Sequence, residues 1–299
     1  MKHLSKLLAL LLSLLLPVIA LGEAATSPAF ADFSEKFADK FLPQGAAPIM
    51  TENSYQSDSM NITITGSRVE RSDVYVVDIY VRSVECFQRV HAGGGYGKTT
   101  SRVRTMAADG NAIVAMTGDN GHYFNAGWSV SNGKVNRDTP NRMRDIAIVY
   151  RSGEMVTVNH ADVDNDQIRA DVDANNIWHI FLFGPALLDA QGKATLDFSN
   201  ITIHQENPRS AIGYFEPGHY CFVQVDGRGV KSALEERRSS IGLDLNHLAQ
   251  LMESLGCKAA YNLDGGQSSM LVFDGKIYST PFEGGRNVGD AIIIKDLPD

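Results

Sequence analysis

The sequence predicts an α+β fold in a single domain, with a mixed, largely antiparallel sheet and a few packed helices. Apolar segments of strand length follow one another along the chain, and residues 74–81 (VYVVDIYV) are one example. Ser131-Asn132-Gly133-Lys134 has the sequence of a type I′ hairpin turn. Asp244 precedes a segment with apolar residues at helical spacing, which ends at Gly256. Short strands, hairpins and helices mixed in this way favour the α+β class.

The first 60 residues are expected to lie outside this domain. Basic residues precede an apolar segment, 7–21, and small residues surround Gly22, so we expect residues 1–22 to be a signal peptide. An apolar segment of this length is short for a membrane span. Residues 23–60 are rich in Ala, Ser, Pro and Glu and are expected to form a spacer before a domain at 61–299. We therefore expect a secreted, periplasmic or cell-envelope protein with no membrane span after signal removal.

Within the domain, each expected strand is an apolar run bounded by turn residues. The expected strands occupy residues 62–69, 74–81, 112–116, 146–150, 220–225, 259–263 and 270–273, and a buried segment at 177–188 is interrupted by Gly184-Pro185. The expected helices occupy the polar segment 165–174 and the segment after Asp244, whose apolar face is formed by Leu245, Leu248, Ala249, Met252 and Leu255.

Charge and cysteine content limit the function classes. A net charge of −8 argues against a nucleic-acid partner, which normally needs a basic face. The chain has three cysteines, so at least one is unpaired in a monomer. Cys221 and Cys257 each open an expected strand and are candidates for a disulfide, although buried free thiols are the more common arrangement.

Acidic and glycine-rich loops follow several expected strands. Asp264 and Gly265-Gly266 come directly after the strand at 259–263, and Ser268 and Ser269 follow. A carboxylate beside flexible backbone and hydroxyl groups is typical of a polar-ligand site. The alternative is a hairpin in which these side chains only cap the turn.

Similar loops end two other strands. Asp119 follows the strand at 112–116, and Asp226-Gly227-Arg228 follows the strand at 220–225. Arg209, directly after Pro208, is a candidate to bind an anion through its two-pronged guanidinium. The alternative for each is a local turn or ion pair.

Two further patterns are weak. Residues 92–99 resemble a relaxed phosphate-binding loop, which needs a helix opening at Lys98. The aspartates at 162–173 suggest a calcium loop, but its glycine position is occupied by Gln167, and a solvated helix is the better interpretation. The chain contains no hydrolytic zinc motif and no Gly-x-Ser-x-Gly motif. We expect neither a metal nor a cofactor.

Several segments together resemble the phosphodiester glycosidase family. They are Phe183-Gly-Pro185, Asn207-Pro-Arg-Ser-Ala-Ile-Gly213, Val225-Asp-Gly-Arg228, Leu255-Gly-Cys257, Asn262-Leu-Asp-Gly-Gly-Gln-Ser-Ser269 and Gly285-Arg286. The resemblance is strongest from about residue 183 to 294 and extends more weakly to about residue 62. The best-known member removes N-acetylglucosamine from a sugar phosphodiester, and many bacterial members are named exopolysaccharide biosynthesis proteins. Thr117, Ser131 and Gln267 depart from the family pattern.

The resemblance implies hydrolysis of a glycosyl phosphodiester at the sugar C1–O bond, which releases a sugar and a phosphomonoester. Asp264 is the first choice for the carboxylate near C1, and Asp119 or Asp226 would complete a pair. The candidates to bind phosphate or sugar oxygens are Arg209, Arg228, Arg286, Asn262, Gly265, Gly266, Ser268 and Ser269.

Two other functions remain open at this point. One is a non-catalytic envelope protein that binds a glycan or teichoic acid on the same scaffold. The other is a glycosidase that acts on exopolysaccharide without phosphate, for which the three candidate arginines would have no ligand role.

Overall fold

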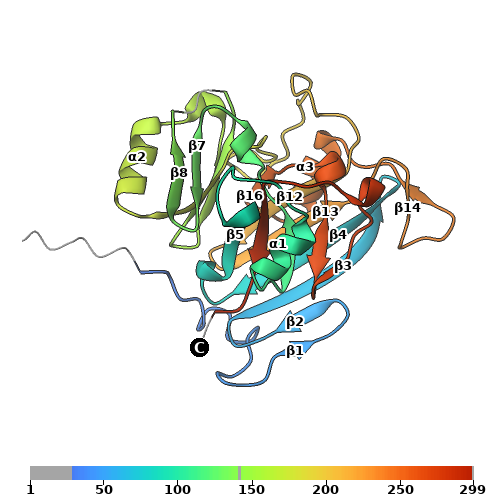
Figure 1. Ribbon diagram of the computed structural model, residues 1–299, viewed down its shortest axis with the longest axis horizontal. Helices are drawn as coiled ribbons and strands as arrows, with labels where there is room; N and C mark the ends of the chain where they lie inside the picture. Colours follow the sequence, from blue (N-terminus) through green and yellow to red (C-terminus); the bar gives the residue numbers. More distant parts are fainter. Residues whose placement is uncertain (1–28, 141–142, 298–299) are drawn as a thin grey trace, which may run out of the picture.

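The computed structural model describes residues 29–140 and 143–297 (Figure 1). Among these residues the strands form three large antiparallel sheets and one small one. The first sheet has the order β1 (Ile49–Met50), β2 (Ser54–Gln56), β3 (Met60–Val69), β4 (Ser72–Val81), β13 (His219–Val225), β12 (Arg209–Glu216) and β16 (Ala259–Asn262). The second has the order β10 (Met155–Val158), β9 (Ile146–Tyr150), β11 (Ile177–Phe181), β7 (Trp128–Ser131) and β8 (Lys134–Asp138).

The third sheet has the order β18 (Lys276–Ile277), β17 (Leu271–Phe273), β6 (Val114–Thr117), β19 (Asp290–Ile294) and β5 (Phe87–His91). The small sheet pairs β14 (Val230–Lys231) with β15 (Ser239–Ser240). The α-helices are α1 (Val103–Asp109), α2 (Asn165–Asp173) and α3 (Leu245–Ser254). The 3₁₀ turns are η1 (Val84–Cys86), η2 (Ala92–Gly94), η3 (Gly121–Tyr123), η4 (His160–Asp162), η5 (Gly266–Ser268) and η6 (Phe282–Gly284).

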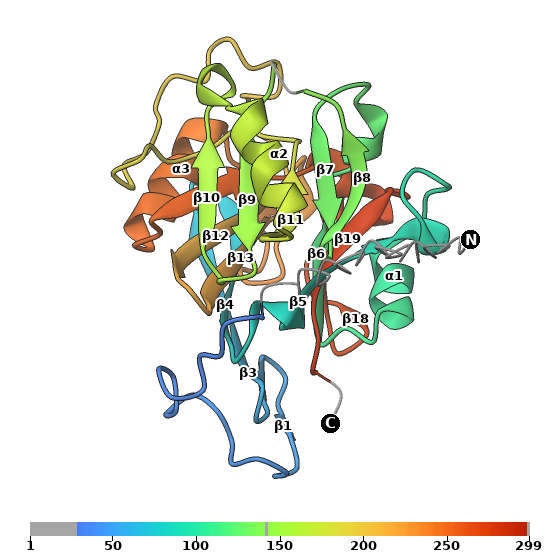
Figure 2. The same cartoon turned by 90° about the vertical axis from the view of Figure 1, so that its left-hand side faces the viewer.

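Each large sheet carries one helix on its outer face, and the inner faces meet in a common core. In β19, Ile292 and Ile294 join the central core, whereas Ala291 and Ile293 pack in the cluster beneath α1. This alternation follows from the two-residue period of a strand. Helix α2 lies against the outer face of the second sheet (Figure 2), and its Ile168 packs with the residues of that face. Helix α3 covers the outer face of the first sheet in the same way. With both faces covered, strands such as β19 are buried throughout.

The expected fold class and its largely antiparallel character are confirmed. The pairings recorded for the described residues are all antiparallel, so the parallel part of a mixed sheet is not found there. The two expected helices are present, with Asp164 and Asp244 accepting hydrogen bonds at their N-termini. No helix opens at Lys98, because α1 begins only at Val103.

Ordered structure begins earlier than residue 61, where the domain was expected to start. Within the segment expected to be a spacer, β1 and β2 extend the first sheet, and Phe33 and Phe37 are buried. The expected signal peptide at residues 1–22 lies outside the described residues. Within the described part of the chain, no helix has the length and hydrophobicity needed to cross a membrane.

The cysteines are free thiols in this structure. Cys86, Cys221 and Cys257 are all buried. The Sγ atoms of Cys221 and Cys257 lie 3.8 Å apart, so the sequence correctly placed these two residues side by side. They are not joined by a bond, which agrees with the more common of the two arrangements considered.

Candidate active site

The acidic and glycine-rich loops converge at one edge of the first and third sheets. Antiparallel pairing places the end of β16 beside the start of β12, with Asn262 opposite Ala211. The end of β13 also lies beside the start of β12, with Val225 opposite Arg209. The N–H of Asp264 donates to the carbonyl of Gly118 (3.2 Å) and links this edge to the loop after β6. Segments far apart in sequence therefore build one site.

Asp264 lies at the centre of this site. Its Oδ2 accepts a hydrogen bond from Asn120 Nδ2 (2.7 Å) and an ion-paired hydrogen bond from Arg286 Nη2 (3.2 Å). Arg286 Nε also donates to Ser268 Oγ (2.6 Å). The Arg286 side chain is 50% exposed, whereas that of Asp264 is 6% exposed. The arginine is thus positioned to meet a ligand arriving from solvent while it contacts the carboxylate.

Asp119 lies deeper, behind Asn120. Its Oδ1 accepts hydrogen bonds from the backbone N–H groups of Leu182 (2.8 Å) and Phe183 (2.6 Å). Its Oδ2 lies 3.6 Å from Arg89 Nη2. This oxygen has no hydrogen-bond partner among the residues the structure describes. Asp119 therefore has one fixed carboxylate oxygen and one oxygen free to accept.

A buried ion pair between Arg89 and Asp290 supports this loop. Arg89 donates to Asp290 Oδ2 through Nε (3.1 Å) and Nη2 (2.7 Å). Asp290 in turn accepts from the backbone N–H of Asn120 through Oδ1 (2.7 Å). Both residues are 2% exposed. Removing one member of such a pair would leave a buried charge, which typically costs about 3–5 kcal/mol.

Burial and these contacts give the three aspartates different pKa values. Burial raises the pKa of Asp119 to about 6, although Arg89 opposes the shift. Burial also raises the pKa of Asp264, and Ser268 and Arg286 reduce the rise. For Asp290, burial is outweighed mainly by the attraction of Arg89, and the pKa falls below its ordinary value. Carboxyl groups with separated pKa values are suited to different roles in proton transfer.

Arg228 approaches the same loop from the other side. It donates through Nε (3.2 Å) and Nη2 (3.1 Å) to Asn207 Oδ1, and its guanidinium lies 5.4 Å from the ring centroid of Phe282. The Arg228 guanidinium lies against Gly266, where an added Cβ would lie 2.8 Å from Nη2, and the positive φ of Gly266 (+63°) favours glycine there. Arg228 and Arg286 therefore both lie beside the Gly265-Gly266 segment.

Four residues predicted from the sequence have mainly structural contacts. Arg209 is 2% exposed and donates to backbone carbonyls, including those of Leu243 (2.8 Å) and Ile203 (2.8 Å). These hydrogen bonds hold the loop that precedes β12. The environment of Arg209 therefore does not favour its predicted role of binding an anion. Asn262 Nδ2 donates to the carbonyl of Gly184 (2.8 Å). The other two residues, Ser269 and Asp226, also contact neighbouring parts of the protein.

Ser269 is buried, with its Oγ 3.4 Å from that of Ser210. Asp226 accepts from the backbone N–H of Thr280 through both carboxylate oxygens (3.1 and 2.9 Å). It thereby anchors the loop that leads to Arg286, and no hydrogen bond in the described part of the chain joins it to Asp119 or Asp264. Burial raises the pKa of Asp226 to about 6.

The sequence did not single out Arg89, Asp290 or Asn120. A signal was present: Arg89 lies in strand β5 between the buried Phe87 and the apolar Val90, and Asp290 directly precedes Ala-Ile-Ile-Ile at the start of β19. A charged residue inside a buried strand needs a partner, and pairing the two strands supplies it.

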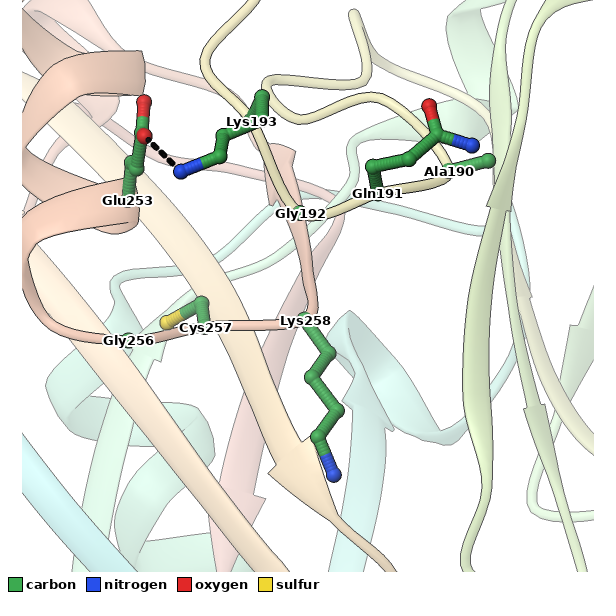
Figure 3. Close-up of a pocket in the computed structure, with 8 residues that line it drawn as sticks. All are labelled: Ala190, Gln191, Gly192, Lys193, Glu253, Gly256, Cys257 and Lys258. Atoms are coloured by element: carbon green, nitrogen blue, oxygen red, sulfur yellow. Dashed lines mark hydrogen bonds and ion pairs between the residues drawn. The ribbon is translucent and has the colours of Figure 1, made fainter.

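Within residues 29–140 and 143–297, no group of three or more His, Cys, Asp or Glu side chains is placed to hold a metal ion. The aspartates at 162–173 lie in the turn η4 and in helix α2 with its cap Asp164, as the solvated-helix interpretation predicted. A pocket of about 460 Å³ lies between the loop at 190–193 and the end of α3 (Figure 3). An ion pair between Lys193 and Glu253 (3.0 Å) crosses it. None of the predicted site residues lines this pocket.

Paired carboxylates and arginines at strand ends are the groups that enzymes acting on glycosidic and phosphate linkages use. The family model for phosphodiester glycosidases matches residues 104–295. The chain therefore belongs to the phosphodiester glycosidase family, as its motifs predicted.

The chain also resembles other proteins at low identity. The SPbeta prophage-derived uncharacterized protein YomE of Bacillus subtilis (strain 168) is 26% identical over 210 residues, which cover 67% of this chain and 30% of that protein. The chain thus spans less than a third of that relative.

The zebrafish N-acetylglucosamine-1-phosphodiester alpha-N-acetylglucosaminidase catalytic domain, auto-inhibited by its pro-peptide, has a TM-score of 0.59 and 18% identity over 91% of this chain and 97% of that one. A hypothetical protein from Synechocystis has a TM-score of 0.58 and 16% identity over 84% and 64% of the two chains. These solved structures share the fold.

Proposed function

We propose that this protein is an exported hydrolase that cleaves the C1–O bond of a glycosyl phosphodiester and releases a sugar and a phosphomonoester. Membership of the phosphodiester glycosidase family supports this class of activity in general. One observation carries the proposal for this chain: Asp264, Arg286 and Ser268 form one hydrogen-bonded group at the solvent side of a buried acidic site.

Cleavage at C1 needs negative charge near the sugar and positive charge near the departing phosphate. The sugar develops oxocarbenium character, which a carboxylate at C1 stabilises. Asp264 is the more exposed of the two carboxylates and is assigned this role. The C1–O electron pair leaves with the phosphate oxygen, water supplies the new C1–O bond, and a carboxylate accepts the proton from water. We assign proton transfer to Asp119, whose free Oδ2 and pKa of about 6 suit it.

The phosphate is assigned to Arg228 and Arg286. Both lie beside the Gly265-Gly266 segment, and Arg286 is half exposed. Arginine binds phosphate through two parallel hydrogen bonds, and a phosphate that leaves readily needs little help from a general acid. Arg209 is left out of this set because backbone carbonyls occupy its Nε and Nη2.

The arginines test the substrate class. Arg228→Lys and Arg286→Lys should lose at least tenfold in kcat/KM on a glycosyl-1-phosphodiester, because lysine cannot form the two-pronged contact. They should lose much less on an uncharged glycoside with a good leaving group. Arg238→Lys is the matched control, since Arg238 is an exposed arginine that pairs with Glu235 (3.2 Å).

Equal losses on charged and uncharged substrates would mean that the arginines are structural, and a glycosidase for exopolysaccharide without phosphate would then be favoured. Binding without release of sugar from any compound in a panel of glycosyl-1-phosphodiesters would favour the non-catalytic glycan-binding protein.

Export is part of the proposal and rests on the sequence of residues 1–22. Mass spectrometry of the protein recovered from the medium or periplasm should find a chain that begins near residue 23. A full-length chain retained in the cytoplasm would contradict export.

A further inference from the structure

The turn η3 places an exposed aromatic ring beside the candidate active site. Tyr123 is 62% exposed, and among the described residues it is the only aromatic side chain that is mostly exposed. Its ring centroid lies 4.0 Å from that of His122, and the two ring planes are tilted by 38°. An exposed aromatic ring that is held against a second ring offers a fixed apolar surface to a ligand.

His122 holds this pair against the residues that precede β19. A Cβ on Gly289 would lie 2.0 Å from His122 Cε1 and 2.2 Å from Nδ1, so the imidazole packs directly on the glycine backbone. Neither ring nitrogen has a hydrogen bond recorded to the described part of the chain. Burial lowers the pKa of His122, although Asp290 and Asp264 oppose the shift, so the ring is neutral near pH 7. A neutral imidazole can both donate and accept a hydrogen bond.

A second tyrosine–histidine stack in the protein shows the contacts of a purely structural pair. The rings of Tyr80 and His219 lie 3.9 Å apart and are nearly parallel (13°). His219 Nε2 donates to Asp78 Oδ1 (2.7 Å), and Tyr80 is half-buried. Protein groups thus satisfy that pair. In the pair of His122 and Tyr123, the imidazole nitrogens and most of the phenol ring are available to a ligand.

Asn120 connects the pair to the carboxylate that is assigned to C1. Its Oδ1 accepts from the N–H of Gly289 (2.9 Å), on which His122 packs, and its Nδ2 donates to Asp264 Oδ2 (2.7 Å). The charges of Asp290 and Asp264 both act on the imidazole. A ligand of the size of a sugar ring that lies at Asp264 can therefore also contact this turn.

The chemistry of the pair selects its ligand. An aromatic face can cover the C–H groups on one face of a pyranose, and a neutral imidazole can bond to a hydroxyl group. The carboxylates of Asp264 and Asp290 disfavour negative charge on the sugar. The phosphate, in contrast, is assigned to Arg228 and Arg286. This turn therefore suits a sugar that has no carboxylate of its own.

We propose that His122 and Tyr123 form a sugar-binding subsite beside Asp264, which takes a pyranose without negative charge. Tyr123 contacts the apolar face of the sugar, and His122 bonds to one of its hydroxyl groups. The inference rests on the proposed function, which places C1 of the sugar at Asp264 and the phosphate at Arg286. Both residues then determine specificity and take no part in bond cleavage.

Binding of an analogue that cannot be cleaved tests the subsite without turnover. In a methyl C-glycosyl phosphonate, a CH₂ group replaces the oxygen at C1. Titration calorimetry should show that the wild-type protein binds at least one neutral analogue, of glucose, galactose or N-acetylglucosamine, more tightly than the analogue of glucuronic acid. Tyr123→Ala should weaken binding of the preferred neutral analogue by about tenfold, because the apolar contact is lost. Tyr123→Phe keeps the ring and should bind as the wild type does.

His122→Ala should weaken the same binding by about fivefold, because one hydrogen bond is lost. Tyr80→Ala, which removes the tyrosine of the structural stack, is the matched control and should bind as the wild type does. Unchanged affinity in either Tyr123→Ala or His122→Ala would overturn the subsite. A preference for the glucuronic acid analogue, or no binding of any neutral analogue, would overturn it as well.

Saturation-transfer NMR gives a second readout on the same analogue. Irradiation of aromatic protons should transfer magnetisation to the sugar protons in the wild type and in Tyr80→Ala, and much less in Tyr123→Ala. A transfer that is equal in all three proteins would contradict contact with Tyr123.

The subsite and the proposed function can fail separately. Affinity that depends on Tyr123 and His122, in a protein that hydrolyses no glycosyl phosphodiester, would contradict the proposed function and leave the subsite standing. Hydrolysis by a protein whose affinity for the analogue does not depend on these residues would support the function and overturn the subsite.

Discussion

At the scale of single residues, the contacts of three buried aspartates decide their protonation. Asp290 receives two hydrogen bonds from Arg89 and is held ionised, whereas Asp119 lies 3.6 Å from the same guanidinium and has its pKa raised by burial. Asp264 is intermediate, since burial raises its pKa and Arg286 opposes the rise. One arginine placed closer to Asp290 than to Asp119 thus lowers the pKa of the first carboxyl group and leaves that of the second raised.

Asp264→Asn should abolish turnover and keep the fold. The side chain lies at a strand end, and an amide can still accept from Asn120, but it carries no charge toward C1. The rate should fall by about two to three orders of magnitude, the scale of a lost catalytic group. Asp274→Asn, at an exposed turn where Asp274 pairs with Lys276 (3.1 Å), is the control for rate and for melting temperature.

A rate for Asp264→Asn close to that of the wild type would remove this residue from the catalytic site. A melting temperature far below that of the control would assign it a structural role instead.

At the scale of elements, the covered outer face of the first sheet determines the chemistry of the cysteines. Cys221 on β13 and Cys257 before β16 lie in the cluster beneath α3, and Gly213 between them leaves room for both sulfur atoms. The hydrogen bond with the Cys257 thiol, together with burial, raises the pKa of Cys221 well above its ordinary value. The unreactive thiol form is thereby favoured.

A thiol reagent should therefore react with no cysteine of the native protein and with three in denaturant. The counting is done by absorbance or by mass spectrometry of the alkylated chain without reductant. A single reactive thiol in denaturant, that of Cys86, would mean that Cys221 and Cys257 are joined by a disulfide in the isolated protein.

At the scale of the whole molecule, buried carboxyl groups link stability to pH. The pKa values of Asp119 and Asp226 are both raised to about 6 in the folded protein. A raised pKa means that the folded state holds protons more tightly than the unfolded state, so stability falls as pH rises from about 4 to about 6. Asp290 has the opposite effect on stability at lower pH. Because its pKa is lowered in the folded state, the stability that it contributes is lost as the pH falls.

The Asp226→Asn variant should lose part of this pH dependence. An amide in place of the carboxylate still accepts from Thr280 but does not become charged, so stability should fall less between pH 4 and 6. At pH 7 the variant should be more stable than the wild type by on the order of 1–2 kcal/mol in urea unfolding. Equal slopes for both proteins would contradict the account of Asp226.

The fold class and the loops that converge at the candidate site could be predicted from the sequence because their signals are local. Asp264, Asp119 and Arg228 each lie in a loop that follows an apolar strand, whereas Arg286 was a candidate only through the family resemblance. Arg89 and Asp290 were missed because their pairing joins strands that lie some two hundred residues apart in sequence.

The direction of a side chain also escaped prediction. Arg209 follows a proline at a strand start, as an anion-binding arginine would, yet its guanidinium turns to the carbonyls of the preceding loop. Asp226 ends a strand as Asp264 does, but it anchors a neighbouring loop. Which partner lies nearest depends on tertiary packing rather than on the local sequence.

Hydrolysis in ¹⁸O-labelled water tests the central claim most directly, because it reports which bond breaks. The protein is incubated with a glycosyl-1-phosphodiester, and both products are analysed by mass spectrometry, with Asp264→Asn as the inactive control. Cleavage at C1–O predicts that the label enters the sugar and that the phosphomonoester stays unlabelled. Label in the phosphomonoester would mean that the P–O bond breaks, and it would contradict the assignment of this protein as a phosphodiester glycosidase.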